Sequence, residues 1–250
     1  MRPIRAVVLA VISAVAASAI AYVAYFRPRI KSWGFDAGEA QMTLPGDELV
    51  SEPTAHETRG ITIDAPVSEV WPWLVQMGYG RGGWYSYEPL DSKQPSAHEI
   101  LPEFQDLKVG DQMPTYPGFS FEVRVVEPEH ALVLFTDTAQ ARSQMEAAGQ
   151  EMKGRQDVPE FSASWGFYLE PDGDTKSRLI ERFRIQGPSN APKVVLNEAL
   201  GTGVVLMARK QLIGIKERVE RLGVQQEADA DVQPTPEPGF APDPGFSPAN

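Results

Sequence analysis

Residues 58–90, TRGITIDAPVSEVWPWLVQMGYGRGGWYSYEPL, decide the fold of this chain. The apolar residues 61–63 predict a short strand that ends in the turn Asp64-Ala65-Pro66. A helix should follow, with Pro66 at its first position and a bend near Trp71 caused by Pro72, because proline lacks a backbone N–H. Its apolar residues have the spacing of one buried stripe: Val67, Val70, Trp71, Leu74 and Met77. A glycine-rich turn then leads into a predicted aromatic strand, 84–88.

The rest of the chain predicts more strands and one long helix. Turn-forming residues separate five further runs with strand character: 112–116, 121–127, 132–136, 161–170 and 178–185. Apolar and polar residues alternate in 161–170, so we expect one buried face and one mostly solvated face there. A final helix is predicted from about 192 to 222, before Gly223. This order contains no βαβ alternation and indicates an α+β fold.

The order of elements over residues 57–223 resembles the START-like superfamily, also called SRPBCC or polyketide cyclase-like. The stretches WPWLVQMGYGRGGWYSYEPLD (71–91) and LPEFQDLKVGD (101–111) are similar to a bacterial, membrane-associated subgroup of it. The resemblance implies a helix-grip fold, in which an antiparallel β-sheet wraps around a long C-terminal α-helix and encloses an apolar cavity. It implies a hydrophobic small molecule or lipid as ligand. It supplies no catalytic residues.

The N-terminus predicts a membrane anchor within residues 1–31. Residues 6–26 carry no charge, and 21 helical residues span about 31 Å, close to the thickness of a bilayer core. The alternative is a signal peptide cleaved at Ala17-Ser18-Ala19. A single-pass cell-membrane protein is expected. The side of the soluble domain stays open, although a slight excess of basic residues after the segment favours the cytoplasm.

Charge and composition set further limits. The net charge is −11 and the first 31 residues carry +5, so the remainder carries −16 and should repel nucleic acid. The absence of cysteine excludes disulfides and thiolate chemistry. Residues 224–250 are acidic and rich in proline, which predicts a disordered tail. The tail either keeps the protein soluble or docks a partner through the repeat at 236–248, with Phe240 and Phe246 as anchors.

Several motifs that carry chemistry are missing or misplaced. Residues 78–83 satisfy G-x-G-x-x-G, but they follow a predicted helix and open a strand, so they indicate a turn rather than a dinucleotide site. The histidines, His56, His98 and His130, form no H-E-x-x-H pair. The sequence contains no G-x-S-x-G, P-loop or EF-hand pattern. We therefore expect neither a metal nor a cofactor.

Candidate cavity residues come from the predicted strands and from the final helix. The aromatic candidates and the carboxylates supply apolar walls and polar groups, and two helical glycines would leave room for a ligand beside the backbone. These residues are Trp84, Tyr85, Tyr87, Phe121, Glu122, Trp165, Phe167, Glu181, Gly201 and Gly203. Ordinary core packing explains the aromatic residues equally well. Glu122 and Glu181, if they met in an apolar cavity, could perform acid–base chemistry.

Three functional hypotheses follow. The first is a membrane-anchored START-like domain that binds a hydrophobic ligand, and the second is a cyclase, dehydratase or hydrolase on the same fold. The third is an interaction module that uses the tail or the polar segment 138–157, which interrupts the strands as an insertion. That insertion is either a lid over a cavity or a solvated helical excursion. Residues 32–56 lack periodicity and indicate a linker or an extended arm.

Overall fold

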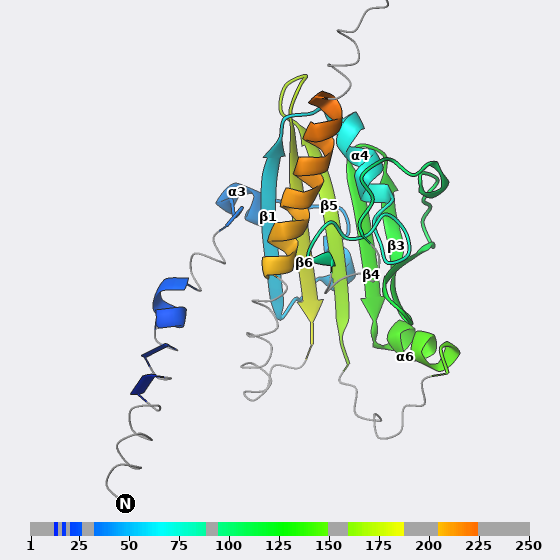
Figure 1. Cartoon of the computed structure of the whole chain (residues 1–250). Coiled ribbons are helices and arrows are strands. Elements are labelled where there is room, and N and C mark those ends of the chain that lie inside the picture. The colour runs from blue at the N-terminus through cyan, green and yellow to red at the C-terminus, as the bar shows by residue number, and fades with distance from the viewer. Residues whose placement is uncertain are drawn as a thin grey trace, which may run out of the picture.

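A six-stranded antiparallel sheet forms the body of the molecule (Figure 1). The computed structural model describes residues 13–14, 17–18, 21–26, 33–88, 95–149, 160–187 and 205–224. The strand order is β1-β6-β5-β4-β3-β2, so the first and last strands of the chain are neighbours. The strands are β1 (Ala55–Ile63), β2 (Gln112–Tyr116), β3 (Phe119–Glu127), β4 (Ala131–Asp137), β5 (Ser162–Pro171) and β6 (Ser177–Gln186).

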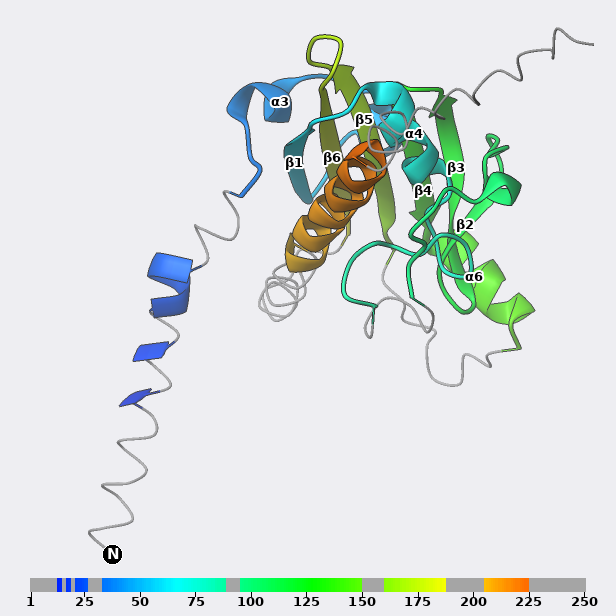
Figure 2. The same cartoon turned by 45° about the horizontal axis from the view of Figure 1, so that its top comes forward.

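Two helices cover one face of the sheet, which we call the inner face (Figures 1 and 2). They are α4 (Val67–Val75) and the C-terminal helix, described over 205–224 and drawn in orange. Their apolar residues pack on the inner-face residues of β3 to β6 and form the main hydrophobic core. The predicted α+β architecture, with strands followed by a C-terminal helix, is confirmed. The predicted residues 192–204 of that helix lie outside the described residues.

Helix α4 differs in detail from its prediction. Pro66 precedes the helix with extended backbone angles, and the helix continues through Pro72 to Val75. Trp73 and Val75 are buried while Trp71 is only half-buried, so the stripe facing the core is broader than the predicted spacing. Met77 is buried just beyond the helix.

The prediction of a strand at 84–88 is wrong, because these residues form no strand. This segment follows a tight turn that a bridge between Gly78 and Gly83 closes, and Tyr85 adopts a positive φ of 58°. The Tyr85 N–H donates to Ser96 Oγ at 3.2 Å, and its carbonyl packs against Gly214 of the C-terminal helix. Because these partners are distant in sequence, contacts across the fold, rather than a strand partner, set the backbone here.

Gly214→Ala is expected to destabilise the protein although alanine favours helices. A Cβ at this position would lie 2.0 Å from the Tyr85 carbonyl oxygen, so the loop or the helix must move. Gly223→Ala is the matched control, because no atom lies within 4 Å of its added Cβ and alanine gains about 1 kcal/mol over glycine within a helix. Thermal unfolding should show a lower Tm for the first variant only. An unchanged Tm for Gly214→Ala would contradict this packing.

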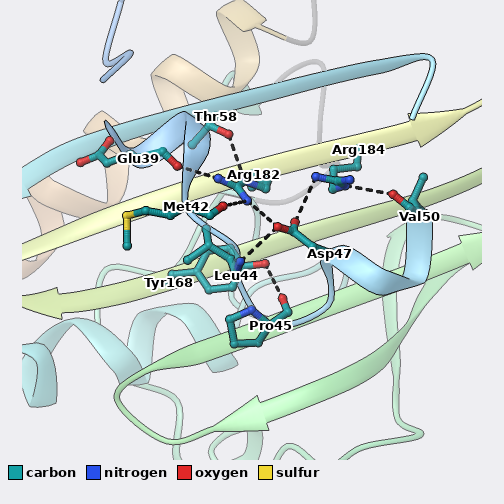
Figure 3. Close-up of polar contacts among 10 residues, drawn as sticks. All are labelled: Glu39, Met42, Leu44, Pro45, Asp47, Val50, Thr58, Tyr168, Arg182 and Arg184. Atoms are coloured by element: carbon teal, nitrogen blue, oxygen red, sulfur yellow. Dashed lines mark hydrogen bonds and ion pairs between the residues drawn. The ribbon is translucent and has the colours of Figure 1, made fainter. Parts of the chain in front are cut away.

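The opposite, outer face of the sheet is also covered, contrary to the expected solvated face. Residues 36–50 cross it as a segment containing α3 (Ala37–Gln41) and η2 (Asp47–Val50). Leu44 of this segment packs with Tyr168 and Ile180 in a second apolar cluster. Tyr168 is only 3% exposed, and its hydroxyl donates to the Pro45 carbonyl at 2.7 Å (Figure 3).

Arg182 on β6 fastens this segment to the sheet (Figure 3). Its side chain is 2% exposed, and its guanidinium forms an ion pair with Asp47 at 2.7 Å. It also donates to the carbonyls of Met42 and Glu39 and, through Nε, to Thr58 Oγ1. Every nitrogen of the group therefore has a partner, as burial of a charge requires. Arg182 therefore lies on the outer face, away from the aromatic residues of the inner face.

Asp47→Asn is expected to lower the free energy of unfolding by about 3 kcal/mol, because the Arg182 charge stays buried without its counter-charge. Asp106→Asn is the control. Its ion pair with Lys108 has similar length, but the two side chains are 83% and 68% exposed, so the change should stay within about 0.5 kcal/mol. Urea unfolding of both variants measures the difference. Equal effects would show that the buried pair does not hold the segment.

Several sequence predictions fall partly or wholly outside the described residues. The helix α6 (Thr138–Ala147) confirms a helix at the start of the insertion, and residues 150–157 are not described. Most of the predicted anchor 6–26 and the tail beyond residue 224 are not described either. No helix among the described residues has the length and apolar character that crossing a bilayer requires.

Candidate functional site

An aromatic cluster centred on Trp165 occupies the inner face of the sheet. Alternation along β5 puts Trp165 and Phe167 on this face, and the register places Phe183 of β6 opposite Trp165. The Trp84 ring stacks on Trp165 with centroids 4.9 Å apart and planes 16° apart. Phe167, Phe121 and Phe183 surround the same indole at centroid distances of 5.3, 6.1 and 6.5 Å.

The cluster continues as a row of rings toward the turn between β2 and β3. Phe119 contacts Phe121 edge-on at 5.8 Å, and Tyr116 stacks on Phe119 at 5.5 Å. Tyr116 is half exposed and Phe121 is buried, so the row leads from the surface to the interior. Trp165, Phe183 and Phe119 are only partly buried, which leaves apolar surface on this side of the sheet.

Glu181 is a buried carboxyl within this cluster. It lies opposite Phe167 in the register and is 5% exposed. The Trp165 indole N–H donates to its Oε1 at 2.7 Å. Burial raises the pKa of Glu181 to about 7, although the Trp165 hydrogen bond and the nearby Arg59 charge act in the opposite direction.

Two buried polar atoms beside Trp165 lack hydrogen-bond partners among the described residues. They are Oε2 of Glu181 and Nε1 of Trp84, whose side chain is 4% exposed. An unpaired buried polar group costs roughly 1–3 kcal/mol, and native proteins rarely leave one unsatisfied. Both atoms beside this indole therefore lack the hydrogen-bond partner that a buried polar group usually has.

The structure brings together five of the ten residues singled out in the sequence: Trp84, Phe121, Trp165, Phe167 and Glu181. Tyr87 is 44% exposed and makes no ring contact with the cluster. Gly201 and Gly203 lie outside the described residues. Sequence reasoning missed Phe183 and Phe119 as site residues. The alternation in 178–185 could have found Phe183, because it shares a face with Glu181.

Tyr85 supports the fold beside the cluster. Its hydroxyl donates to the Trp73 carbonyl at 3.2 Å and accepts from Gln76 at 3.0 Å. Burial raises the pKa of this phenol well above its ordinary value. The Arg218 guanidinium lies 4.9 Å from its ring centroid. These contacts join α4, the glycine-rich turn and the C-terminal helix.

Glu122 and Glu181 do not meet. The register aligns Glu122 with Phe135, on the outer face, whereas Glu181 is aligned with Phe167 on the inner face. Glu122 forms an ion pair with Arg124 at 2.9 Å and accepts a hydrogen bond from Gln140 of α6 at 2.8 Å. A mechanism that uses this pair of carboxylates in one cavity is therefore excluded.

The glycine-rich segment 78–83 is a turn, as the sequence predicted. Arg81 within it donates to the carbonyls of Val75, the last residue of α4, and of Met77 just beyond the helix, and its guanidinium packs on Phe104. This arginine secures the turn. Within the described part of the chain, no three His, Asp or Glu side chains are grouped as a metal site would require.

Comparisons with known proteins give only distant structural similarities. No family model and no curated protein matches the sequence. A hypothetical protein of Helicobacter pylori is 14% identical, with a TM-score of 0.42 over 70% of this chain and 94% of that one. A Mesorhizobium loti protein is 16% identical, with a TM-score of 0.38 over 67% and 98%.

A third similar structure is DynU16, a protein of the dynemicin biosynthetic locus. It is 15% identical, with a TM-score of 0.35, and the match covers 64% of this chain and 46% of DynU16. The chain thus matches about half the length of that protein. The sheet-plus-helix architecture is compatible with an SRPBCC-like fold.

Glu181→Gln is expected to remove a pH dependence of stability. The folded protein holds this proton up to about pH 7, whereas the ordinary glutamate pKa is 4.5. The contribution of Glu181 to stability is therefore complete at low pH and declines by up to about 3 kcal/mol as the pH rises from about 4.5 to about 7. Urea unfolding at pH 5 and pH 8 measures the decline, which the variant should lack.

Glu122→Gln is the matched control for this measurement, because the same substitution is made on the outer face beside Arg124. It should retain the wild-type difference between the two pH values. If Glu181→Gln also retains the full difference, another group is responsible and the Glu181 carboxyl does not titrate as a buried acid.

Proposed function

We propose that this chain is a START-like protein that binds an apolar small molecule or lipid at the Trp165 cluster. The observation that carries the proposal is the pair of buried, unpartnered atoms, Glu181 Oε2 and Trp84 Nε1, set in an aromatic wall. Ligand sites combine apolar walls with a few well-placed polar groups, and this arrangement has both. A core built only for packing would gain nothing from a buried carboxyl.

Partial exposure of the rings supports the same function. Trp165 and Phe183 pack against the core but keep accessible surface, unlike the fully buried Phe167. An apolar ligand would cover that surface and gain about 25 cal/mol for each Å² removed from water.

We further propose that residues 6–26 anchor the protein in the cell membrane. Their length and lack of charge support a single transmembrane helix. An anchored domain would take an apolar ligand from the bilayer or from its surface. Extraction at alkaline pH tests this part alone, because an anchored chain stays in the membrane pellet whereas a cleaved or peripheral chain is released.

Acid–base catalysis on the bound molecule is a second candidate function. It is favoured by the Glu181 pKa of about 7, which lets one carboxyl both give and accept a proton near neutral pH. Under this proposal, Glu181→Gln abolishes conversion of the bound molecule while the ligand still binds. Retained conversion would eliminate the catalytic role.

Native mass spectrometry of the full-length protein, followed by organic extraction, tests ligand binding. We expect a stoichiometric apolar adduct. Trp165→Ala should reduce its occupancy about tenfold, because the central indole contributes contact area and positions Glu181. Phe183→Leu is a milder second variant that keeps an apolar side chain.

Tyr87→Ala is the matched aromatic control, because Tyr87 is exposed and lies outside the cluster. It should keep the wild-type occupancy. Absence of any adduct, together with no uptake of a hydrophobic dye by the folded protein, would overturn the proposal. Equal losses for Trp165→Ala and Tyr87→Ala would place the ligand elsewhere.

A further inference from the structure

We infer that the ligand carries a neutral hydroxyl as its polar end, which donates a hydrogen bond to Glu181 and accepts one from Trp84. The inference rests on the proposed function and specifies the chemical class of the ligand. It excludes fatty-acid anions and amines as the preferred occupants.

The two unpartnered atoms flank the same indole. Trp165 donates its N–H to Oε1 of Glu181, which holds the carboxyl group, and Oε2 has no hydrogen-bond partner among the described residues. Trp84 stacks on the Trp165 ring, so its own N–H belongs to the same cluster. Both side chains are more than nine-tenths buried.

The hydrogen-bonding capacity of these atoms decides the head group. An indole N–H can only donate, and an ionised carboxylate can only accept. A hydroxyl both donates and accepts, so this head group has the hydrogen-bonding capacity that both atoms require. A carboxylate head lacks a donor for Glu181, and an ammonium head lacks an acceptor for Trp84.

The charges near Glu181 also disfavour an anionic head. Its neighbours on β5, Phe167 and Trp165, are uncharged. On β1, Arg59 lies opposite Glu181 but already binds Glu57 and the Trp33 carbonyl. Glu57 adds a second negative charge, but its effect on the Glu181 pKa is smaller than that of Arg59. The like charge that a carboxylate head would meet is therefore that of ionised Glu181 itself, which is unfavourable at a buried contact.

The described cations of the C-terminal helix have other contacts. Lys216 binds Glu220 and the Thr62 carbonyl, and Arg218 binds the Ala97 carbonyl. Lys210 pairs with Glu217, and Arg209 packs on the Trp33 ring. Arg221 is exposed. These contacts leave the charge around Glu181 to be set by Glu57 and Arg59.

The test compares three probes with the same twelve-carbon chain: 1-dodecanol, dodecanoate and dodecylamine. Equilibrium dialysis of each radiolabelled probe against the full-length protein gives Kd at pH 6 and pH 8. At pH 8 we expect dodecanol to bind at least about tenfold more tightly than either charged probe. The disadvantage of dodecanoate should shrink at pH 6, because protonated Glu181 can donate to it.

Two variants assign the preference to the named atoms. Glu181→Gln should abolish the change in dodecanoate affinity between the two pH values, and Glu122→Gln should leave it as in the wild type. Trp84→Phe removes the indole N–H but keeps a ring. It should weaken dodecanol binding about fivefold without weakening dodecylamine binding.

Each outcome bears on one proposal or both. Equal or tighter binding of dodecanoate or dodecylamine at pH 8 would overturn the hydroxyl inference while leaving ligand binding intact. A dodecanol preference that Glu181→Gln and Trp84→Phe both leave unchanged would overturn it as well. If none of the three probes binds and extraction yields no apolar molecule, the proposed function fails and the inference fails with it.

Discussion

The rest of the structure depends on the burial of two consecutive charged residues, Glu181 and Arg182, on opposite faces of β6. Strand β6 lies between β1 and β5 in the sheet, and both of its faces are covered. The two side chains are 5% and 2% exposed. Because a buried charge is expensive unless it is paired and hydrogen-bonded, each face must supply partners. The two faces do so to different extents.

On the outer face every nitrogen of Arg182 has a partner. Asp47, Thr58 and two backbone carbonyls accept its hydrogen bonds, and this arrangement requires an ordered segment of chain across the sheet. On the inner face Glu181 receives a single hydrogen bond from the described residues, that of Trp165. Within this part of the chain, one oxygen of Glu181 has no partner. This asymmetry distinguishes the outer ion pair from the inner carboxyl at which we propose that a ligand binds.

Much of the architecture was readable in the sequence because it depends on local pattern. Alternation placed Trp165, Phe167 and Glu181 on one face, and the turn residues separated the strands correctly. The covered outer face was not readable, since residues 36–50 have no periodicity and Asp47 meets Arg182 across 135 residues of sequence. The conformation of 84–88 was equally hidden, because Tyr85 is positioned by Ser96 and Gly214. Trp165, Phe167 and Glu181 in the cluster followed from alternation, whereas Trp84 joins the cluster from a segment whose predicted strand is not formed.

Glu122 and Glu181 show why residue type alone could not assign the site. Both are glutamates on strands rich in aromatic residues, but Glu122 keeps a 26% exposed side chain beside Arg124 and Gln140. The Arg124 guanidinium balances the charge of Glu122, and the side chain is partly hydrated. The Glu122 carboxylate therefore already has the partners that a charged group requires. Glu181 has its orientation fixed by Trp165, its charge disfavoured by burial, and one oxygen without a partner. A carboxyl with fixed geometry and an unmet hydrogen bond is preorganised for binding. A ligand that donates this hydrogen bond does not have to order the carboxyl first.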